Sequence, residues 1–346
     1  MNSWDVIITG AGLIGVSLGL ELHGRGAKVL LLDRGEPGKE ASSAAAGMLA
    51  PSDPETLPAL QPLALESARM FPEYVRRLEN LSGMSVDFRS QGTIVFGDSA
   101  SVSPSYHALS GYDLRRLEPL IRNHGHTGFL VQEGSVDPRL LMRAALSAAQ
   151  ACGLEIRSNT EAQKFHWTGS HVEVLTDSGT FTGAAAVNCR GAWSGMPVRP
   201  RKGQMLYVQP SRPVLQHVLR APEVYIVPRS TGKVLVGATV EDVGYDKRVE
   251  ISTIQDLLKG GAQYLPELAS SPIVDSWAGL RPGTPDDLPI LGPTDTPGVF
   301  VASGHFRNGI LLAPITARIM ADLIIGKTPN IEIAPFAASR FASVKA

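Results

Sequence analysis

The chain is poor in cysteine: Cys152 and Cys189 are the only two among its 346 residues. They stand far apart and lack the short spacing of metal-ligating cysteines, so the sequence predicts neither a zinc site nor a disulfide framework. Two isolated thiols are typical of buried structural residues in a protein of a reducing compartment.

The chain also lacks an excess of either charge, with 32 Lys and Arg against 33 Asp and Glu and no block of like charge. A nucleic-acid-binding stripe or an acidic tail would need such a block. No apolar run approaches the ~18 residues of a membrane span. The first 20 residues have no Lys or Arg before their apolar part, which glycines interrupt, unlike a signal peptide. We expect a cytoplasmic protein that binds neither nucleic acid nor a membrane.

What the chain does contain is a dinucleotide-binding pattern near its start. A strand, the turn GAGLIG (10–15), a helix and a second strand ending at Asp33 follow one another. Gly10 allows a tight turn, Gly12 lets the backbone approach a pyrophosphate, and Gly15 lets the helix pack on the strand. The helix N-terminus favours phosphates, and Asp33 can accept hydrogen bonds from a ribose. A glycine-rich turn without a nucleotide is the simpler alternative, but the order of elements favours nucleotide binding.

The stretch ASSAAAGMLAP (41–51) contains almost only small residues. It is either a linker or a wall of the cofactor site. In the second interpretation Ser42 and Ser43 donate hydrogen bonds to phosphate. Ala46 and Gly47 then let a flat ring system lie close to the backbone.

The other end of the chain predicts a second strand–loop–helix unit, at 298–327, with Pro314 near the helix start and Gly326 at its stop. Between the ends, residues 203–275 alternate with a period of two, as strands do, around one helix near 252–265. We therefore expect an α/β (mixed α+β) fold in which a discontinuous nucleotide-binding domain is interleaved with a substrate domain. The predicted boundaries are 1–45, 136–200 and 292–346 for the first domain, and 46–135 and 201–291 for the second.

Two further helices are predicted by local signals. One covers 59–83. The other covers 136–153, where Asp137 is a natural N-cap, Pro138 fits the first helical position and Gly153 fits the stop.

The segment WAGLRPG (277–283) places Arg281 among apolar residues and glycines. A guanidinium keeps its charge, and in such a setting it needs a planar anion that accepts two parallel hydrogen bonds. That partner is either an internal acid, such as Asp286 or Asp287, or the carboxylate of a bound small molecule.

Eight stretches, in order along nearly the whole chain, resemble the D-amino-acid-oxidase-like family of FAD enzymes, most closely its glycine oxidase branch tied to thiazole biosynthesis. They are GAGLIG, SSAAAGML, VNCRGAWSG, KGQML, YIVPR, VGATVED, WAGLRPGTPDDLPILG and GHFRNGILLAP. The resemblance implies a non-covalent FAD, a Rossmann-like FAD-binding domain, and a substrate domain built on a large antiparallel sheet.

The resemblance also implies roles for single residues. Arg281 would grip the substrate carboxylate, Tyr225 would support it or cap the pocket, and Arg307 would lie close to the reacting centre. The backbone of Ala162 would meet the adenine side. The expected cofactor contacts are Gly10, Gly12, Leu13, Ile14, Gly15, Asp33, Arg34, Ser42, Ser43, Ala46, Gly47, Met48, Ala162, His305, Phe306, Arg307, Asn308, Gly309, Ile310 and Leu311.

Several of these residues have simpler interpretations. Tyr225 lies in an alternating run and is equally a core aromatic, Arg307 is equally a phosphate or surface contact, and His305 is a donor that fills its loop without a catalytic role. A helix expected to begin near Gly309 would point its positive end at the flavin.

The chain departs from the family pattern at four places. Val240 stands where glycine oxidases often have Met, which indicates a roomier pocket. Arg190 replaces the small residue usual before Gly191, and the connection 196–202 is shorter than in relatives. No cysteine follows Cys189, whereas some sarcosine-oxidising relatives tether FAD through a late cysteine.

The resemblance implies oxidation of glycine, sarcosine or small D-amino acids by hydride transfer from Cα to flavin N5. Products would be an imine or oxo acid, ammonia and hydrogen peroxide, with oxygen as acceptor. No carboxylate pair or Ser/His/Asp set is evident, and the amine lone pair can drive the reaction once the substrate is oriented. The alternatives are a flavin dehydrogenase of N-substituted glycines or 2-hydroxy acids that does not use oxygen, and a non-catalytic FAD subunit. The number of subunits, a homo-oligomer included, stays open.

Overall fold

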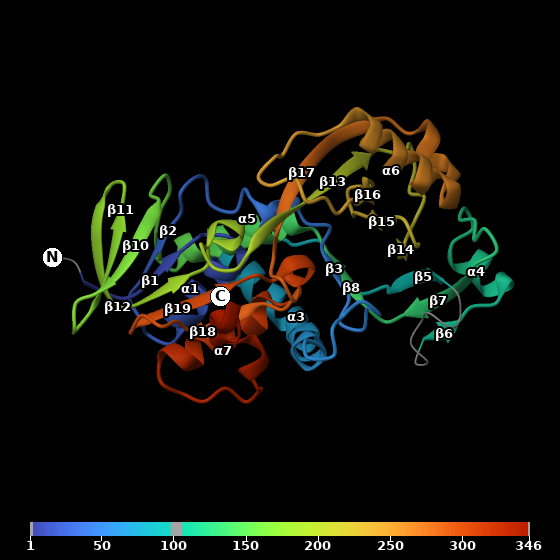
Figure 1. Ribbon diagram of the computed structural model, residues 1–346. Helices are drawn as coiled ribbons and strands as arrows, with labels where there is room; N and C mark the ends of the chain where they lie inside the picture. Colours follow the sequence, from blue (N-terminus) through green and yellow to red (C-terminus); the bar gives the residue numbers. More distant parts are fainter. Residues whose placement is uncertain (1–2, 98–105, 345–346) are drawn as a thin grey trace.

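The computed structural model describes residues 3–97 and 106–344, which form a mixed α/β fold with two large sheets and one small sheet. Figure 1 shows the first sheet on the left and the second on the right, the latter with α6 beside it. The chain passes repeatedly between them, since its first and last strands both belong to the first sheet. The predicted fold class is confirmed.

The first sheet has the strand order β10-β11-β12-β1-β2-β9, and β19 pairs with β12 and β18 with β19. Its centre is parallel, because β1 runs parallel to both β2 and β12. A strand–glycine turn–helix–strand sequence predicts this arrangement. The strands are β1 (Ser3–Thr9), β2 (Val29–Leu32), β9 (Glu155–Arg157), β10 (Ala162–Trp167), β11 (Val172–Thr176), β12 (Gly179–Asn188), β18 (Ile290–Pro293) and β19 (Val299–Ser303).

Helices cover one face of the first sheet. Helix α1 contacts α5 and α7, and α3 packs against the same two helices. Ile8 and Leu31 join this helix-lined core, while their neighbours Ile7 and Leu30 point into a smaller core on the opposite face, as the two-residue period of a strand requires. The helices are α1 (Leu13–Gly24), α3 (Gln61–Ser82), α5 (Pro138–Ala151) and α7 (Ala313–Ile324).

The second sheet has the order β17-β13-β16-β15-β14-β5-β7-β6 and is antiparallel except between β14 and β5. Helix α6 (Ile251–Tyr264) packs on one face through a core that includes Leu206 and Val236. The other face carries Met205 and Tyr225. The strands are β5 (Thr93–Gly97), β6 (His107–Ala108), β7 (Thr127–Val131), β13 (Arg199–Val208), β14 (Val218–Arg220), β15 (Tyr225–Pro228), β16 (Val234–Gly237) and β17 (Ile273–Gly283).

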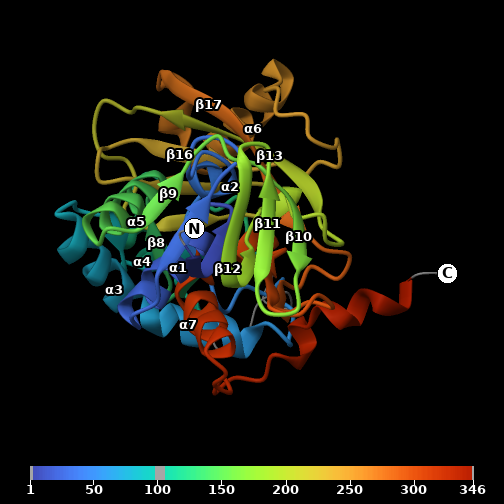
Figure 2. The ribbon, with the colours of Figure 1, turned by 90° about the vertical axis from the view of Figure 1, so that its left-hand side faces the viewer.

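A small sheet of order β3-β8-β4 lies between the two large ones (Figure 1). Figure 2 shows β13, β16 and β17 above the first sheet, with α1 and α3 to the left of β12 and α7 below. The remaining elements are β3 (Met48–Leu49), β4 (Phe88–Arg89), β8 (Gly134–Val136), α2 (Ala41–Ala44) and α4 (Gly111–Leu117).

The helices predicted over 59–83, 136–153 and 252–265 are confirmed as α3, α5 and α6. In α5 the Asp137 carboxylate accepts from two backbone N–H groups, as expected of an N-cap. Pro138 follows it.

Two expectations need correction. The last helix begins at Ala313 rather than near Gly309, because a 3-10 turn over Phe306–Asn308 comes first. The segment 46–135 does not belong wholly to the second unit, the part of the molecule built on the second sheet. Its helix α3 packs in the helix-lined core of the first unit, the part built on the first sheet.

Candidate active site

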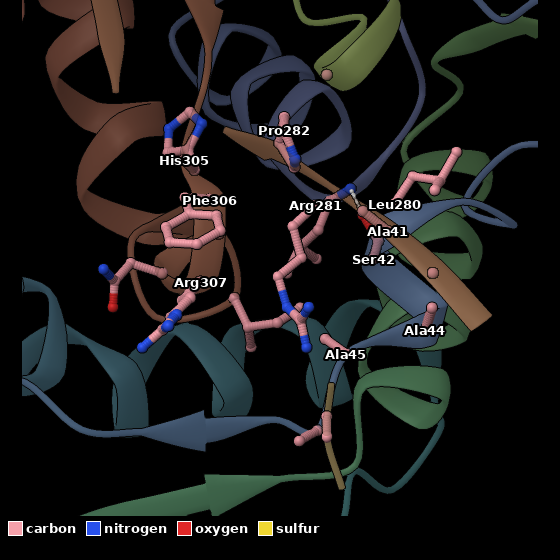
Figure 3. A pocket seen from close by; sticks show the side chains of 18 of the residues that line it. Ala41, Ser42, Ala44, Ala45, Leu280, Arg281, Pro282, His305, Phe306 and Arg307 are labelled. Atoms are coloured by element: carbon pink, nitrogen blue, oxygen red, sulfur yellow. Dashed lines mark hydrogen bonds between the residues drawn. The ribbon is translucent and has the colours of Figure 1, made fainter. Parts of the chain in front are cut away.

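A cavity of about 960 Å³ lies between the two large sheets. Its walls come from the α1 turn, the α2 segment, the loop that precedes α7, and strands of the second sheet. Figure 3 shows Ala41 to Ala45 on one side and His305 to Arg307 on the other, with Arg281 between them. The volume lies in the range of cofactor and ligand sites.

Most predicted site residues line this cavity. Three do not: Gly15, Ser43 and Leu311. The predicted residues that line it are Gly10, Gly12, Leu13, Ile14, Asp33, Arg34, Ser42, Ala46, Gly47, Met48, Ala162, Tyr225, Arg281, His305, Phe306, Arg307, Asn308, Gly309 and Ile310.

The glycines of the α1 turn have no room for side chains. Gly10 adopts a φ of +98°, and a Cβ there would lie 2.4 Å from the carbonyl oxygen of Cys189. A Cβ on Gly15 would lie 2.0 Å from the carbonyl oxygen of Gly10, so this glycine serves the packing of α1 on β1. No side chain caps α1 at Gly12, and its first turn carries no acid. This helix end, where the Ser42 hydroxyl accepts only from the N–H of Leu13, lies beside an open cavity and fits the pyrophosphate of a dinucleotide.

Asp33, at the end of β2, is fixed by the backbone. Its carboxylate accepts from the N–H of Ala11 at 2.7 Å and of Gly35 at 2.9 Å. The adjacent Arg34 stacks on the Trp193 ring at 3.7 Å and pairs with Glu40 at 3.1 Å. One end of the cavity is therefore rigid.

The two serines of the small-residue stretch have separate roles. The Ser42 hydroxyl accepts from the N–H of Leu13 at 2.9 Å and lines the cavity, as Figure 3 shows. The Ser43 hydroxyl donates instead to the carbonyl of Gly38 at 2.6 Å and points elsewhere. The predicted contact of Ser43 with phosphate is thus wrong, because α2 is a helical turn in which adjacent side chains point in different directions.

Gly47 is required by its contacts. Its φ is +80°, and a Cβ there would lie 1.9 Å from the carbonyl oxygen of Val136. The buried Arg229 donates to the carbonyls of Val136 at 2.9 Å and Ala46 at 2.6 Å, and so fixes this wall. Arg229 lies in the YIVPR stretch, but nothing in that pattern predicts this contact.

Arg190 is a further residue with a defined position. Its guanidinium donates to the carbonyls of Ala162 at 2.6 Å and Ser194 at 3.1 Å, and to the Asn188 side chain at 3.1 Å. Burial lowers its pKa from the ordinary value. The Ala162 carbonyl therefore already accepts a hydrogen bond within the protein, and Arg190 joins Arg34 as a cation in the cavity lining.

Arg281 lies on β17 and reaches into the cavity. It donates to the Thr239 carbonyl at 3.0 Å. No Asp or Glu among the described residues forms an ion pair with it, and Asp286 pairs with Arg340 at 2.8 Å instead. A Cβ on Gly203, in the neighbouring strand β13, would lie 2.3 Å from the guanidinium, so the side chain lies against that strand. The interpretation of Arg281 as half of an internal salt bridge is excluded.

Tyr225, at the start of β15, faces the same cavity. Its hydroxyl contacts the sulfur of Met205 at 3.4 Å, and a Cβ on Gly237 would lie 2.8 Å from its ring. Burial raises its pKa, although the nearby Arg281 charge opposes the shift. The phenol therefore stays protonated beside the guanidinium, as a hydrogen-bond donor.

The loop before α7 contains the buried His305 and the half-exposed Arg307. His305 is buried, and its Nε2 hydrogen-bonds with the Thr316 hydroxyl at 3.1 Å. Burial lowers its pKa to about 3, so the imidazole is neutral at physiological pH. Arg307 is half-exposed and pairs with Glu55 at the edge of the cavity. The surface-contact interpretation of Arg307 thus has direct support.

Three other features were not predicted from the sequence. Arg220 lines the cavity and pairs with Asp53 at 2.5 Å and Glu133 at 3.1 Å. Lys202 is buried and pairs with Glu241 at 3.3 Å. The third feature is the Trp193 ring, which lines the cavity and on which the Arg34 guanidinium stacks. Charged residues of ordinary strands give no signal of such contacts until the sheet order is known.

Within residues 3–97 and 106–344, no cluster of His, Cys, Asp and Glu is suited to a metal ion. In the same part of the chain, no helix has the length and apolarity to cross a bilayer.

Comparison with known proteins identifies the family. The family model of FAD dependent oxidoreductases, DAO, matches residues 5–323. The chain is similar to the bifunctional protein ThiO/ThiG of Trichormus variabilis, with 35% identity over 97% of this chain, and spans 55% of that protein's length. It thus covers about half of the curated relatives of this bifunctional kind.

Two other relatives are matched over their whole length. Glycine oxidase of Geobacillus kaustophilus is 33% identical, over 98% of this chain and 97% of that protein. Its crystal structure superposes with a TM-score of 0.93 at 31% identity, covering 98% and 99% of the two chains. Hydrogen cyanide synthase subunit HcnC of Pseudomonas aeruginosa is 30% identical over 98% and 97%. The chain belongs to the DAO family of FAD-dependent oxidoreductases, and FAD is its cofactor.

Proposed function

We propose that the protein oxidises glycine and other small amino acids, such as sarcosine and small D-amino acids, with FAD. The observation that carries the proposal is Arg281, a cation that faces the cavity without an acidic partner among the described residues. A half-buried guanidinium without an internal anion is suited to bind the carboxylate of a ligand. The resemblance to glycine oxidase of Geobacillus kaustophilus supports the same substrate class.

The cofactor would occupy the half of the cavity nearest α1. The N-terminus of α1 after Gly12, whose dipole no acid offsets in the first turn, suits the pyrophosphate, and Asp33 still has lone pairs for the ribose hydroxyls. The residues 305–310 would follow the ring system on the opposite wall. We keep the interleaved domain assignment of 1–45, 136–200 and 292–346 for the FAD-binding part, and add α3 to it.

FAD, when bound, supplies the acceptor for the two electrons taken from the substrate. The chain's own residues bind and orient the substrate. Arg281 would hold its carboxylate, and the Tyr225 hydroxyl would donate to the same group. His305 is neutral and hydrogen-bonded to Thr316, so it is not needed as a base. Catalysis would then depend mainly on proximity and orientation.

The electron acceptor needs a separate assignment. We propose oxygen, with hydrogen peroxide as product. The relative HcnC is named for another activity, hydrogen cyanide synthase, so we keep a second candidate, a dehydrogenase of N-substituted glycines or 2-hydroxy acids that passes electrons elsewhere. A peroxide assay with glycine, run beside an assay with an artificial acceptor, distinguishes the two.

The test of the proposed function is an anaerobic titration of the oxidised holoenzyme with glycine. We expect the flavin absorbance to bleach in the unmodified protein. Arg281→Met should retain FAD but weaken glycine binding about 10- to 100-fold, since a charge-assisted pair contributes roughly 1.5–3 kcal/mol.

The matched control is Arg212→Met, because Arg212 is exposed and does not line the cavity. It should titrate as the unmodified protein does. Bleaching that is equally efficient in Arg281→Met would overturn the carboxylate role, and no bleaching by any small amino acid would overturn the proposed function.

A further inference from the structure

An ion pair between the buried Lys202 and the partly exposed Glu241 lies close to Arg281. The Lys202 side chain is 1% exposed, and its Nζ lies 3.3 Å from the Glu241 carboxylate. The two residues also bridge through their backbones, each N–H donating to the other's carbonyl at 2.9 Å. Lys202 belongs to β13, while Glu241 lies just beyond β16, so the pair joins two segments of the second sheet.

The Glu241 carboxylate binds more than the lysine. It accepts from the Thr239 hydroxyl and from the Gln204 side chain, the latter at 2.9 Å. Burial raises its pKa, but the hydrogen bonds from Thr239, Gln204 and Lys202 lower it more, and the net shift is downward. Glu241 is thus a charged acceptor with three side-chain donors.

The same residues hold Arg281. Its guanidinium donates to the Thr239 carbonyl at 3.0 Å and makes a longer contact of 3.5 Å with the Lys202 carbonyl. These two carbonyls belong to two of the three residues whose side chains are bound to Glu241. The carboxylate therefore binds the side chains of both residues whose carbonyls face the guanidinium, although it does not contact Arg281 itself, and the Lys202 carbonyl also accepts from the Glu241 backbone N–H.

Stability alone is a poor reason for this pair. Removing two charges from water costs more than their attraction usually returns, and replacing a buried ion pair by apolar residues is often neutral or stabilising. Such a pair is useful where it imposes one arrangement of its surroundings.

We propose that Glu241 is a positioning residue for substrate binding, which holds the Arg281 guanidinium in place through Thr239 and Lys202. The inference rests on the proposed function, because it assumes that Arg281 receives a substrate carboxylate. A second contact supports it. The guanidinium lies against Gly203 and also donates to the Thr239 carbonyl, so residues of the β13–β16–β17 region determine its position.

The test uses the holoenzyme and two small probes, acetate and its uncharged match acetamide, titrated by the change in flavin absorbance. Glu241→Gln should weaken acetate binding about fivefold or more and leave acetamide and FAD binding unchanged. The matched control is Asp242→Asn, since Asp242 pairs with Arg199 and Arg201 at the surface and lies one residue away.

The direction in which acetate affinity changes distinguishes a positioning role of Glu241 from a purely electrostatic effect. Removing an acid near Arg281 makes the site more positive and would strengthen acetate binding in both variants. Positioning predicts weaker acetate binding in Glu241→Gln alone. Unchanged or tighter acetate binding in that variant would overturn the inference.

A second variant covers the case in which Glu241→Gln fails to fold. Thr239→Val removes the hydroxyl that donates to Glu241 but keeps the Lys202–Glu241 pair, and we expect a smaller weakening of acetate binding and a raised KM for glycine with kcat little changed. No change in either quantity would contradict the inference.

If Arg281→Met also binds acetate normally, the proposed function fails. If Arg281→Met loses acetate while Glu241→Gln and Thr239→Val keep it, only the positioning role fails.

Discussion

A single buried imidazole illustrates how environment decides the chemistry of a residue. His305 lies in the wall of the cavity but is 3% exposed, and its one side-chain partner among the described residues is the Thr316 hydroxyl. Because no carboxylate compensates a positive charge there, burial lowers its pKa to about 3. The residue is a neutral part of the fold close to the site.

The lowered pKa of His305 makes stability depend on pH in a defined direction. Below about pH 6.5 the unfolded chain binds a proton that the folded protein excludes, so stability falls as the pH falls from 6.5 toward 3. His305→Gln removes that proton while its amide can still bond to Thr316. Urea unfolding at pH 7.5, 5.5 and 4.5 should show the unmodified protein losing up to about 1.4 kcal/mol per pH unit more than the variant. Parallel pH profiles would contradict the neutral imidazole.

Residues differ in how far the sequence alone predicts their roles. For Arg281 the sequence indicates the need for an anion, because a permanent charge in apolar surroundings requires one, but only the structure shows that no internal acid among the described residues pairs with it. The role of Ser43 was not predictable, since only the turn of α2 decides that its hydroxyl reaches the Gly38 carbonyl rather than the cavity. Glu241 gave no signal, because its partners come from strands whose pairing the sequence does not state.

At the scale of elements, glycines in the second sheet make space for the site. A Cβ on Gly203 would lie 2.3 Å from the Arg281 guanidinium, and one on Gly237 would lie 2.8 Å from the Tyr225 ring. Neither glycine needs a positive φ, so both are explained by contact and not by backbone conformation. Adjacent strands β13, β16 and β17 therefore form a surface shaped for these two side chains.

Gly203→Ala tests this surface. The added methyl group meets the end of a flexible side chain, so we expect the fold and FAD binding to persist while the guanidinium shifts. The KM for glycine should rise roughly tenfold to a hundredfold, the loss that a displaced charge-assisted pair produces. Gly111→Ala at the start of α4 is the control, because a Cβ there meets nothing nearer than 3.5 Å. Normal glycine kinetics in Gly203→Ala would contradict the steric argument.

Local signals predicted elements well where a cap or a period defines them. Helix α5 has its Asp137 cap, and α1 has its glycine turn. Pro314 correctly marks the start of α7, whereas a start near Gly309 is wrong because no side chain caps the helix and a 3-10 turn comes first. The packing of α3 on α5 and α7 depends on which apolar face meets which, and such a choice is made by tertiary contacts.

At the scale of the whole molecule, the cavity lies where the two units meet. Its lining combines Gly10 and Asp33 of the first unit with Met205 and Gly279 of the second. A bound FAD therefore stabilises the folded chain as a ligand that the unfolded chain does not bind.

The positions of the two cysteines determine whether FAD can be attached covalently. Cys189 lines the cavity, but burial raises the pKa of its thiol to about 12, and Cys152 does not line it.

The final prediction is that FAD binds reversibly and stabilises the protein by mass action. Each tenfold rise of free FAD above its Kd should add about 1.4 kcal/mol to the free energy of unfolding. A non-covalent cofactor should pass through a filter after denaturation in urea, since a protonated Cys189 thiol is a poor nucleophile for a flavin bond. Hydrogen exchange should slow at both β1 and β13 when FAD is added, because residues of both strands or their ends line the cavity. Flavin retained on the denatured chain, or protection confined to the first unit, would contradict a reversible cofactor held between the two sheets.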